Sequence, residues 1–322
     1  MTSTLEKALN TPKIALGAWA WGTGAAGGDQ VFGNHMTPDE IKPVFQKAMA
    51  EGLNLWDTAA VYGMGSSETI LGNFVKEVPR NSVILSTKFT PQIASADAAA
   101  PAEEMINGSL ARLHADVIDI YWIHNPADIA KWTPELIPLA KAGKIKYIGM
   151  SNHNLEELKL ADQILGEEGL KVSAIQNHYS LLHRSSEDAG ILDYAKENDI
   201  TFFSYMVLEQ GALTGNYSTA NPFPEGSERA EAYNGNLPQL DKLNETLKAI
   251  AEKYQATNAQ VAIAWAIAKG TLPIIGVTKV SQVESAAQSV KLELTAEDIY
   301  SLEKAADQAG VSTIRGWEKP MA

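Results

Sequence analysis

Eight short apolar runs recur along the chain, and each is followed by a stretch with a helical pattern. The runs occupy residues 12–19, 52–57, 82–88, 117–124, 144–152, 171–177, 200–205 and 271–276. Amphipathic stretches, such as residues 39–52, 101–114 and 154–169, stand between them. Buried strands that alternate with helices indicate a parallel sheet with helical crossovers. The repeat therefore predicts an α/β protein.

The length of the chain favours closure of this sheet into one barrel. The 322 residues contain no break in composition that would separate two domains. One α/β barrel can exceed about 250 residues as a single unit. We predict a (β/α)8 TIM barrel as a single domain over residues 1–322. Two segments depart from the repeat, a Gly/Pro/Asn-rich stretch at about 206–240 and an irregular tail at about 310–322. Segments of this kind are usually functional or disordered, and either could cover the mouth of the barrel.

Polar side chains end successive strands of the predicted barrel. Asp57, Lys88 and His124 follow three consecutive apolar runs, and Tyr62 comes shortly after the first of them. Each has an ordinary alternative interpretation, such as a helix cap, a solvated strand end or a core histidine. The carboxyl ends of barrel strands share one face, where active sites are built. Taken together, the four residues predict a catalytic site on that face.

Composition excludes several classes of function. The chain has no cysteine, which rules out disulfides, thiolate chemistry and zinc sites built on cysteine. Its net charge of -13 argues against nucleic acid as a partner. The longest apolar run, residues 261–268, is far shorter than the ~20 residues that cross a bilayer. The N-terminus lacks the apolar centre of a signal peptide. We therefore expect a soluble, cytoplasmic protein with no nucleic-acid or membrane partner.

Two short patterns suggest other chemistry. Residues 22–27 read GTGAAG and match the dinucleotide-binding fingerprint, with a Rossmann fold as the alternative. That fingerprint needs a helix directly after its last glycine, whereas the sequence delays the helix to a Thr37 cap and Pro38. Asp57 also lies too far downstream for the ribose-binding acid. His178 and His183 could form a metal pair, but no carboxylate follows at ligand spacing. We interpret the glycines as a flexible loop and expect no metal site.

Longer motifs resemble the aldo-keto reductase superfamily. The specific elements are DTAAVYG at residues 57–63 and SLARLHADVIDIYWIH at residues 109–124, and GALTGNY follows at 211–217 in the family's order. The resemblance runs from about residue 13 to about residue 300. It implies a (β/α)8 fold that binds a nicotinamide cofactor, usually NADPH, and reduces carbonyl groups to alcohols. A small-molecule carbonyl compound is then the expected partner, whereas the oligomeric state stays open.

The resemblance implies a catalytic tetrad of Asp57, Tyr62, Lys88 and His124. Tyr62 would be the general acid that protonates the carbonyl oxygen as hydride arrives. The Lys88 ammonium would lower the tyrosine pKa toward neutrality, and Asp57 would hold that lysine in place. His124 would donate a second hydrogen bond to the oxygen. A cofactor-binding redox sensor or auxiliary subunit on the same barrel is the alternative function.

The resemblance also implies a set of cofactor-binding positions. These are Ser151, Asn152 and Gln176 for the carboxamide, Tyr205 for stacking, Leu208, Gly211 and Leu213 for the pyrophosphate, and Gly276, Thr278, Lys279 and Gln282 for the 2′-phosphate. The 206–240 segment would clamp the cofactor. Gln282 stands where many relatives have arginine, so we expect a moderate preference for NADPH over NADH.

Two further features concern adenine and substrate. Ser285 and Ala286 replace the residues with which many relatives bind adenine, so adenine recognition is not explained by the sequence. Trp19, Trp21 and Trp122 lie near strand ends, and we interpret them as an apolar wall of the substrate pocket rather than as core residues.

Overall fold

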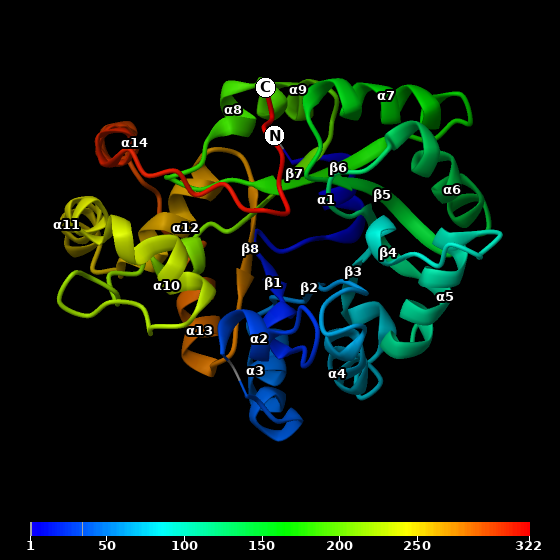
Figure 1. Ribbon diagram of the computed structural model, residues 1–322, viewed down its shortest axis with the longest axis horizontal. Helices are drawn as coiled ribbons and strands as arrows, with labels where there is room; N and C mark the ends of the chain where they lie inside the picture. Colours follow the sequence, from blue (N-terminus) through cyan, green and yellow to red (C-terminus); the bar gives the residue numbers. More distant parts are fainter. Residues whose placement is uncertain (1, 34) are drawn as a thin grey trace.

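The computed structural model describes residues 2–33 and 35–322, whose strands form a closed parallel barrel (Figure 1). The strands are β1 (Ala15–Gly17), β2 (Leu55–Asp57), β3 (Ile84–Phe89), β4 (Ile118–Ile123), β5 (Ile145–Ser151), β6 (Val172–His178), β7 (Thr201–Tyr205) and β8 (Leu272–Gly276). Each strand pairs with the next, and β8 pairs with β1 through Leu16 and Ile275 to close the ring. The eight predicted runs and the predicted (β/α)8 fold are confirmed.

Helices surround the barrel and connect its strands (Figure 1). The main ones are α3 (Pro38–Ala50), α4 (Ser66–Val75), α5 (Pro101–Leu113), α6 (Ile129–Lys141), α7 (Leu155–Gly166), α9 (Ile191–Glu197), α11 (Leu237–Lys253), α12 (Asn258–Ala268), α13 (Val280–Ser289) and α14 (Ala296–Ala309). The shorter ones are α1 (Thr4–Leu9), α2 (Gly28–Phe32), α8 (Ser185–Asp188), α10 (Glu228–Tyr233) and the 3-10 turns η1 (Trp19–Trp21), η2 (Arg80–Ser82), η3 (Pro91–Ile93), η4 (Glu209–Gly211) and η5 (Asn234–Asn236). Local sequence explains several starts. Thr37 caps α3 in a capping box with Glu40, and Pro38 occupies the first turn, as the sequence predicts. In the part of the chain described, no helix is both long and apolar enough to cross a bilayer.

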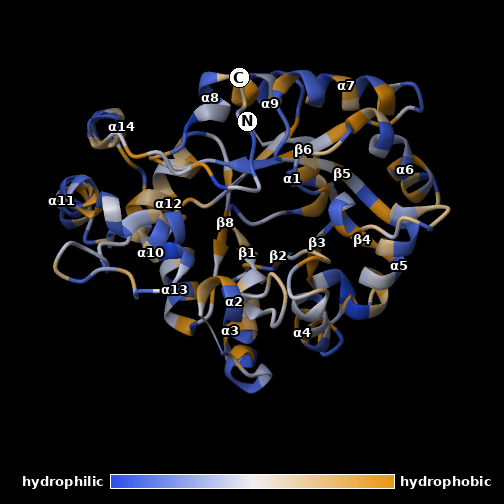
Figure 2. Ribbon diagram, viewed as in Figure 1, coloured by the Kyte–Doolittle hydropathy of each residue, from blue (hydrophilic) through white to orange (hydrophobic). Residues whose placement is uncertain are grey.

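The barrel interior and the helix–sheet interface form separate hydrophobic clusters. Inward-facing side chains fill the barrel, namely Leu5, Ala15, Leu55, Ile84, Ile120, Trp122, Ala174, Phe203 and Leu272. A larger cluster joins the outer faces of the strands to the helices. Figure 2 shows hydrophobic residues along the strands and banded hydrophobic and hydrophilic residues on the surrounding helices. Because strand side chains alternate, Lys88 lies on the same face of β3 as Ile84 and therefore points into the barrel mouth.

The 206–240 segment contains more structure than its sequence indicates. It includes η4, α10, η5 and the first turn of α11. A third hydrophobic cluster holds it together, made of Ala212, Phe223, Ala230, Tyr233, Leu237, Leu240 and Val311. Val311 belongs to the C-terminal tail, so tail and segment pack against each other. The tail, residues 311–322, forms neither helix nor strand over its described length, as predicted.

Candidate active site

Three successive strands bring the four predicted catalytic side chains together. Asp57 ends β2, Tyr62 lies in the following loop, Lys88 is in β3 and His124 follows β4. Lys88 Nζ lies 2.6 Å from Asp57 Oδ2 and 3.4 Å from the Tyr62 hydroxyl. The rings of Tyr62 and His124 meet edge to face, with centroids 5.7 Å apart. The structure thus brings the four residues into one cluster at the carboxyl end of the strands.

Lys88 is held charged in a buried ion pair. Its side chain is fully buried, and Nζ also donates to the Thr58 carbonyl oxygen at 2.7 Å. Asp57 accepts further hydrogen bonds from Ser86 Oγ at 2.6 Å and from Gln176 Nε2 at 3.2 Å. Burial disfavours the ammonium, but Asp57 and Tyr62 together outweigh burial and raise the pKa of Lys88. A fixed positive charge therefore lies beside the tyrosine hydroxyl.

The pKa of Tyr62 moves opposite to the direction expected from the sequence. Burial, together with the Asp57 charge, raises the pKa of Tyr62 more than the charge and hydrogen bond of Lys88 lower it. The expectation that Lys88 brings this pKa toward neutrality was wrong for the protein by itself, because removal from water was not counted. The phenol consequently keeps its proton, which is the form that a general acid requires.

His124 is a neutral imidazole with one nitrogen already engaged. Its Nδ1 lies 2.9 Å from Thr90 Oγ1, and the side chain is nearly buried. Burial and the nearby Lys88 charge hold the pKa of His124 well below its usual value. When the Thr90 hydroxyl donates to Nδ1, the ring proton lies on Nε2, which becomes a hydrogen-bond donor.

The predicted carboxamide site lies next to the tetrad. Ser151, Asn152 and Gln176 are buried at the ends of β5 and β6. Gln176 touches Asp57, and the Tyr205 hydroxyl donates to Asn152 Oδ1 at 2.5 Å. Asn152 has a left-handed backbone with φ of 64°, a conformation that asparagine tolerates better than most residues. These four residues thus form a continuous polar and aromatic surface beside the catalytic cluster.

The predicted pyrophosphate segment differs from expectation. The backbone N–H groups of Gly211 and Leu213 both donate to the Leu208 carbonyl oxygen, at 2.9 and 3.3 Å. These two amides are therefore committed to the turn rather than directed outward. Two arginines approach the same turn from other elements. Arg229 Nη1 lies 3.5 Å from the Gln210 carbonyl oxygen, and Arg315 Nη2 lies 3.4 Å from Gln210 Oε1.

The predicted 2′-phosphate site follows Gly276 at the end of β8. Gln282 Oε1 accepts hydrogen bonds from the Thr278 and Lys279 amides at 2.6 and 3.0 Å, and from Thr278 Oγ1 at 3.2 Å. The donors expected for a phosphate are therefore satisfied by the side chain of Gln282. Lys279 is exposed. Ala286 is completely buried, so it cannot contact an adenine from outside.

The three predicted pocket tryptophans lie in different environments. Trp19 is half-buried and stacks on Tyr62, with centroids 5.0 Å apart and planes at 14°. Trp21 is 1% exposed and donates to the Val277 carbonyl oxygen, so it is a core residue. Trp122 is 0% exposed inside the barrel and donates to Ser86 Oγ at 2.7 Å. The assignment of Trp21 and Trp122 to a pocket wall was wrong, because proximity to a strand end does not give the direction of a side chain.

Some residues of the site were missed in the sequence. Ser86 lies two positions before Lys88 in β3, so strand alternation was a usable signal for it. Thr90, which holds the His124 ring, lies two positions after Lys88 at the end of β3, so the same alternation was a usable signal for it as well. Trp317 of the tail meets Trp19 edge to face at 5.9 Å. Trp317 lies far along the chain from the other site residues, so no sequence pattern linked it to them.

The glycine-rich stretch at residues 22–27 packs against the loop that carries Tyr62 and against the start of α4. A short helix, α2, does start at Gly28, so the expectation that helix begins only at Thr37 was wrong. Gly27 and Gly28 donate their amides to the Gly24 and Gly22 carbonyl oxygens. A Cβ on Gly28 would lie 2.2 Å from the Ala20 carbonyl oxygen, which explains glycine there. The closed barrel excludes the Rossmann alternative.

The protein is a closed parallel barrel whose strand ends carry a buried Asp–Lys pair, a tyrosine and a histidine. Barrel enzymes have their active sites on this face. The model of the aldo/keto reductase family matches residues 13–307. The chain belongs to this family, which is one of oxidoreductases that act on carbonyl groups.

Individual proteins agree with this assignment. The chloroplastic pyridoxal reductase of Arabidopsis thaliana is 31% identical over 95% of this chain and 86% of its own length. An NADP(+) aldo-keto reductase of Schizosaccharomyces pombe is 30% identical over 81% of this chain and 80% of its own. The structure of a glycerol dehydrogenase from Gluconobacter oxydans superposes with a TM-score of 0.81 at 26% identity, covering 95% of this chain and 94% of that one.

Proposed function

We propose that this protein reduces aldehydes or ketones to alcohols with NADPH, with Tyr62 as the general acid. The observation that carries the proposal is the position of Lys88 Nζ, paired with Asp57 at 2.6 Å and 3.4 Å from the Tyr62 hydroxyl. A lysine fixed in this way stabilises negative charge at the tyrosine oxygen at the moment its proton leaves. We also propose a cytoplasmic location, which fits a chain without cysteine.

The residues of the site have separate roles in the proposed carbonyl reduction. A bound nicotinamide cofactor supplies the hydride that adds to the carbonyl carbon. Tyr62 donates its proton to the carbonyl oxygen as negative charge develops there, and Lys88 offsets the charge left on the tyrosine oxygen. His124 donates a second hydrogen bond to the same oxygen from Nε2. Trp19, stacked on Tyr62, limits the positions of the phenol ring and forms one side of the substrate site.

The carboxamide and stacking positions fit a nicotinamide. Asn152 and Gln176 offer amide donors and acceptors, and Ser151 offers a hydroxyl, all beside the catalytic cluster. The ring of Tyr205 provides an aromatic face at the end of β7. Preference for NADPH is supported by the relative from Schizosaccharomyces pombe, which is an NADP(+) enzyme.

The charge distribution supports a polyanionic cofactor. In a chain of net charge -13, cations that are not paired with acids are informative. Within the described residues, neither Arg229 nor Arg315 pairs with a carboxylate, and the Nε atom of each is buried without a hydrogen-bond partner. Both guanidinium groups meet Gln210. We assign them to the pyrophosphate, and Lys279 to the 2′-phosphate, as charge-assisted donors.

The test is cofactor oxidation over a panel of aldehydes and ketones, with NADPH and NADH measured separately. Turnover with NADPH on at least one carbonyl class, and weaker turnover with NADH, is the expected result. Tight binding of NADPH without turnover of any substrate would instead favour the redox-sensor alternative.

A further inference from the structure

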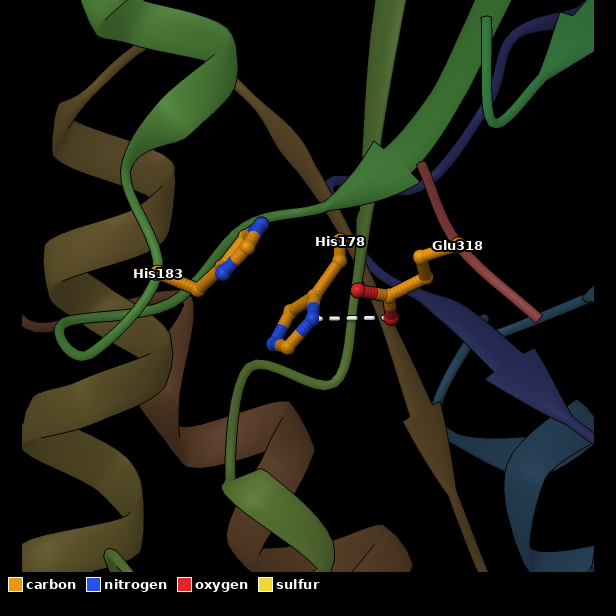
Figure 3. Close-up of side chains that lie close together, drawn as sticks. All are labelled: His178, His183 and Glu318. Carbon is orange, nitrogen blue, oxygen red and sulfur yellow. Dashed lines mark hydrogen bonds and ion pairs between the residues drawn. The ribbon is translucent and has the colours of Figure 1, made fainter. Parts of the chain in front are cut away.

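A buried histidine outside the tetrad joins two acidic side chains. His178 ends β6 and is 1% exposed. Its Nε2 lies 2.7 Å from Glu209 Oε1. Its Nδ1 lies 2.9 Å from Glu318 Oε1 (Figure 3). An imidazole with a carboxylate at each nitrogen donates from both, so it is an imidazolium. Burial opposes this charge, but the two carboxylates outweigh it and raise the pKa of His178 to about 9.

The neighbouring His183 does not turn this cluster into a metal site. The potential ligand atoms of His178, His183 and Glu318 lie within 4.8 Å of one another, so the carboxylate that the sequence did not supply comes from the remote tail. The two rings, however, are stacked at 4.1 Å with planes 13° apart. An imidazole lone pair lies in the plane of its ring, so lone pairs of stacked rings do not converge on one ion. Burial and the His178 charge lower the pKa of His183 to about 4. His183 is therefore neutral, and its ring stacks on that of His178.

Glu209 connects the histidine to the turn after β7. Its buried carboxylate accepts hydrogen bonds from the Tyr233 hydroxyl at 2.8 Å and Thr313 Oγ1 at 3.1 Å, and also from Ser180 Oγ. Glu209 itself has a left-handed backbone with φ of 48°, as do Met206 and Gln210 close by, with φ of 60° and 52°. Non-glycine residues keep such strained backbones only where their surroundings fix them. The buried carboxylate provides that fixation.

Glu318 connects the histidine to Tyr205 and to the tail. The Tyr205 hydroxyl lies 3.1 Å from Glu318 Oε1, and the Arg315 amide donates to Glu318 Oε2 at 3.2 Å. The Glu318 side chain is 2% exposed, although it belongs to a segment without helix or strand. The adjacent Trp317 packs on Trp19, which stacks on Tyr62. The tail therefore contacts Tyr205 directly and is linked to Tyr62 only through Trp19.

We propose that His178 is a positioning residue of the reductase: its positive charge, held between Glu209 and Glu318, fastens the C-terminal tail to the turn after β7 and so fixes Tyr205 and Arg315 at the cofactor site. This role rests on the proposed function, since it concerns residues assigned to the cofactor. The imidazolium is the element that makes the arrangement possible, because without it two buried carboxylates would face each other without compensation.

The test measures the attachment of the tail and the affinity for cofactor in the same variants. Trypsin cleavage after Arg315 releases residues 316–322, and mass spectrometry follows that peptide. His178→Gln removes the positive charge that lies between the Glu209 and Glu318 carboxylates. Glu318→Gln leaves the His178–Glu209 pair intact and alters only the tail, so it remains informative should His178→Gln fold poorly. Lys319→Met is the matched control, because it removes the tail's other ion pair, Lys319–Glu157, whose side chains are 27% and 25% exposed.

Both His178→Gln and Glu318→Gln should raise the cleavage rate roughly tenfold or more, since breaking a fully buried pair is costly whereas the partly exposed Lys319–Glu157 pair contributes less. Lys319→Met should change it by less than about threefold. The same two variants should raise the dissociation constant of NADPH, measured by tryptophan fluorescence. If cleavage is unchanged in His178→Gln and Glu318→Gln, or if Lys319→Met has an equal effect, His178 does not fasten the tail. If the tail is released in these variants but their affinity for NADPH is unchanged, His178 does not position the cofactor site. Failure of the wild-type protein to bind NADPH or NADH would overturn the proposed function itself, and it is distinguishable because the cleavage comparison needs no cofactor.

Discussion

At the scale of single residues, the proposed mechanism depends most directly on the hydroxyl of Tyr62. Tyr62→Phe removes that hydroxyl and keeps the ring that stacks on Trp19. We expect kcat to fall by about 10²-fold or more, on the scale of losing a general acid, while cofactor affinity stays nearly unchanged. Steady-state kinetics and a fluorescence titration with NADPH measure the two quantities. Retention of most of the activity would assign the proton to another group.

The buried pair of Lys88 and Asp57 should contribute both to the proposed catalysis and to the stability of the fold. Lys88→Met should abolish most activity and also destabilise the fold by about 3–5 kcal/mol, because it leaves the Asp57 carboxylate buried without its counter-charge. The double variant Asp57→Asn/Lys88→Met should recover much of that stability without recovering activity. Urea unfolding and kinetics of the two variants provide the comparison. Equal stability of the single and double variants would show that the pair is not the source of the loss.

Residue types and their order predicted that the four candidate catalytic residues lie together, but not how burial and charge act on them. Asp57, Tyr62, Lys88 and His124 could be predicted because polar residues at strand ends of a barrel share one face. The direction of the shift in the pKa of Tyr62 could not be predicted, because burial and charge act on this pKa in opposite directions and their balance is set by the folded structure. The same limit applies to Trp122, whose ring lies over Gly149 inside the barrel, where a Cβ would approach it to 2.2 Å.

At the scale of elements, substitutions in the two proposed phosphate-binding regions should affect NADPH and NADH differently. Lys279 precedes α13 and is assigned to the 2′-phosphate, a group that NADH lacks. Lys279→Ala should therefore raise KM for NADPH by about five- to a hundredfold, corresponding to roughly 1–3 kcal/mol, and leave KM for NADH nearly unchanged. An unchanged KM for NADPH would mean that Lys279 is only a solvated residue at a helix start.

Arg229 and Arg315 reach the turn after β7 and are assigned to the pyrophosphate, which both cofactors carry. Arg229→Met and Arg315→Met should each raise KM for NADPH and NADH by similar factors, on the order of tenfold. Each arginine also lies over an aromatic ring, for Arg315 that of Tyr233 at 4.7 Å, so melting temperatures serve as the control for packing. An effect confined to NADPH would move the arginines to the 2′-phosphate site.

Helices of low periodicity were the elements that the sequence did not predict. The six-residue α10 is too short for a helical repeat to be visible among the Gly, Pro and Asn residues around it. Its Tyr233 is nonetheless fully buried, against residues as distant as Val311. Contacts between such distant parts of the chain leave no local pattern. The long, regular α3 and α5, in contrast, were predictable to within two residues.

At the scale of the whole molecule, repetition explains why the fold was predictable and the contacts of the irregular tail were not. Eight strand units give the same signal eight times, and closure follows from their number. The tail, residues 311–322, occurs once, has no periodicity and is held by single side chains such as Glu318 and Met321. Its buried contacts therefore depend on partners that only the closed barrel brings within reach.

The buried histidines should give the free energy of unfolding a maximum at intermediate pH, with a decline toward acidic pH and another toward alkaline pH. Burial is the main cause that lowers the pKa of His124 well below 6.5, and it lowers those of His153 and His183 to about 4. The unfolded chain binds protons at these residues before the folded one does, so stability should fall as pH drops from about 6.5 toward about 4.

His178 acts in the opposite direction on the alkaline side. It faces the Glu209 and Glu318 carboxylates, the neutral His183 ring and the protonated Tyr205, and its pKa is raised from 6.5 to about 9. Its stabilising contribution is complete below about pH 6.5 and is lost as pH rises through about 9. We expect the free energy of unfolding of the wild-type protein to decline from about pH 7 to about pH 10 more steeply than that of His178→Gln, in urea titrations of both proteins. Lysines and tyrosines titrate in both, so the difference between the two curves isolates His178. Parallel curves over this range would mean that His178 is not charged in the folded protein.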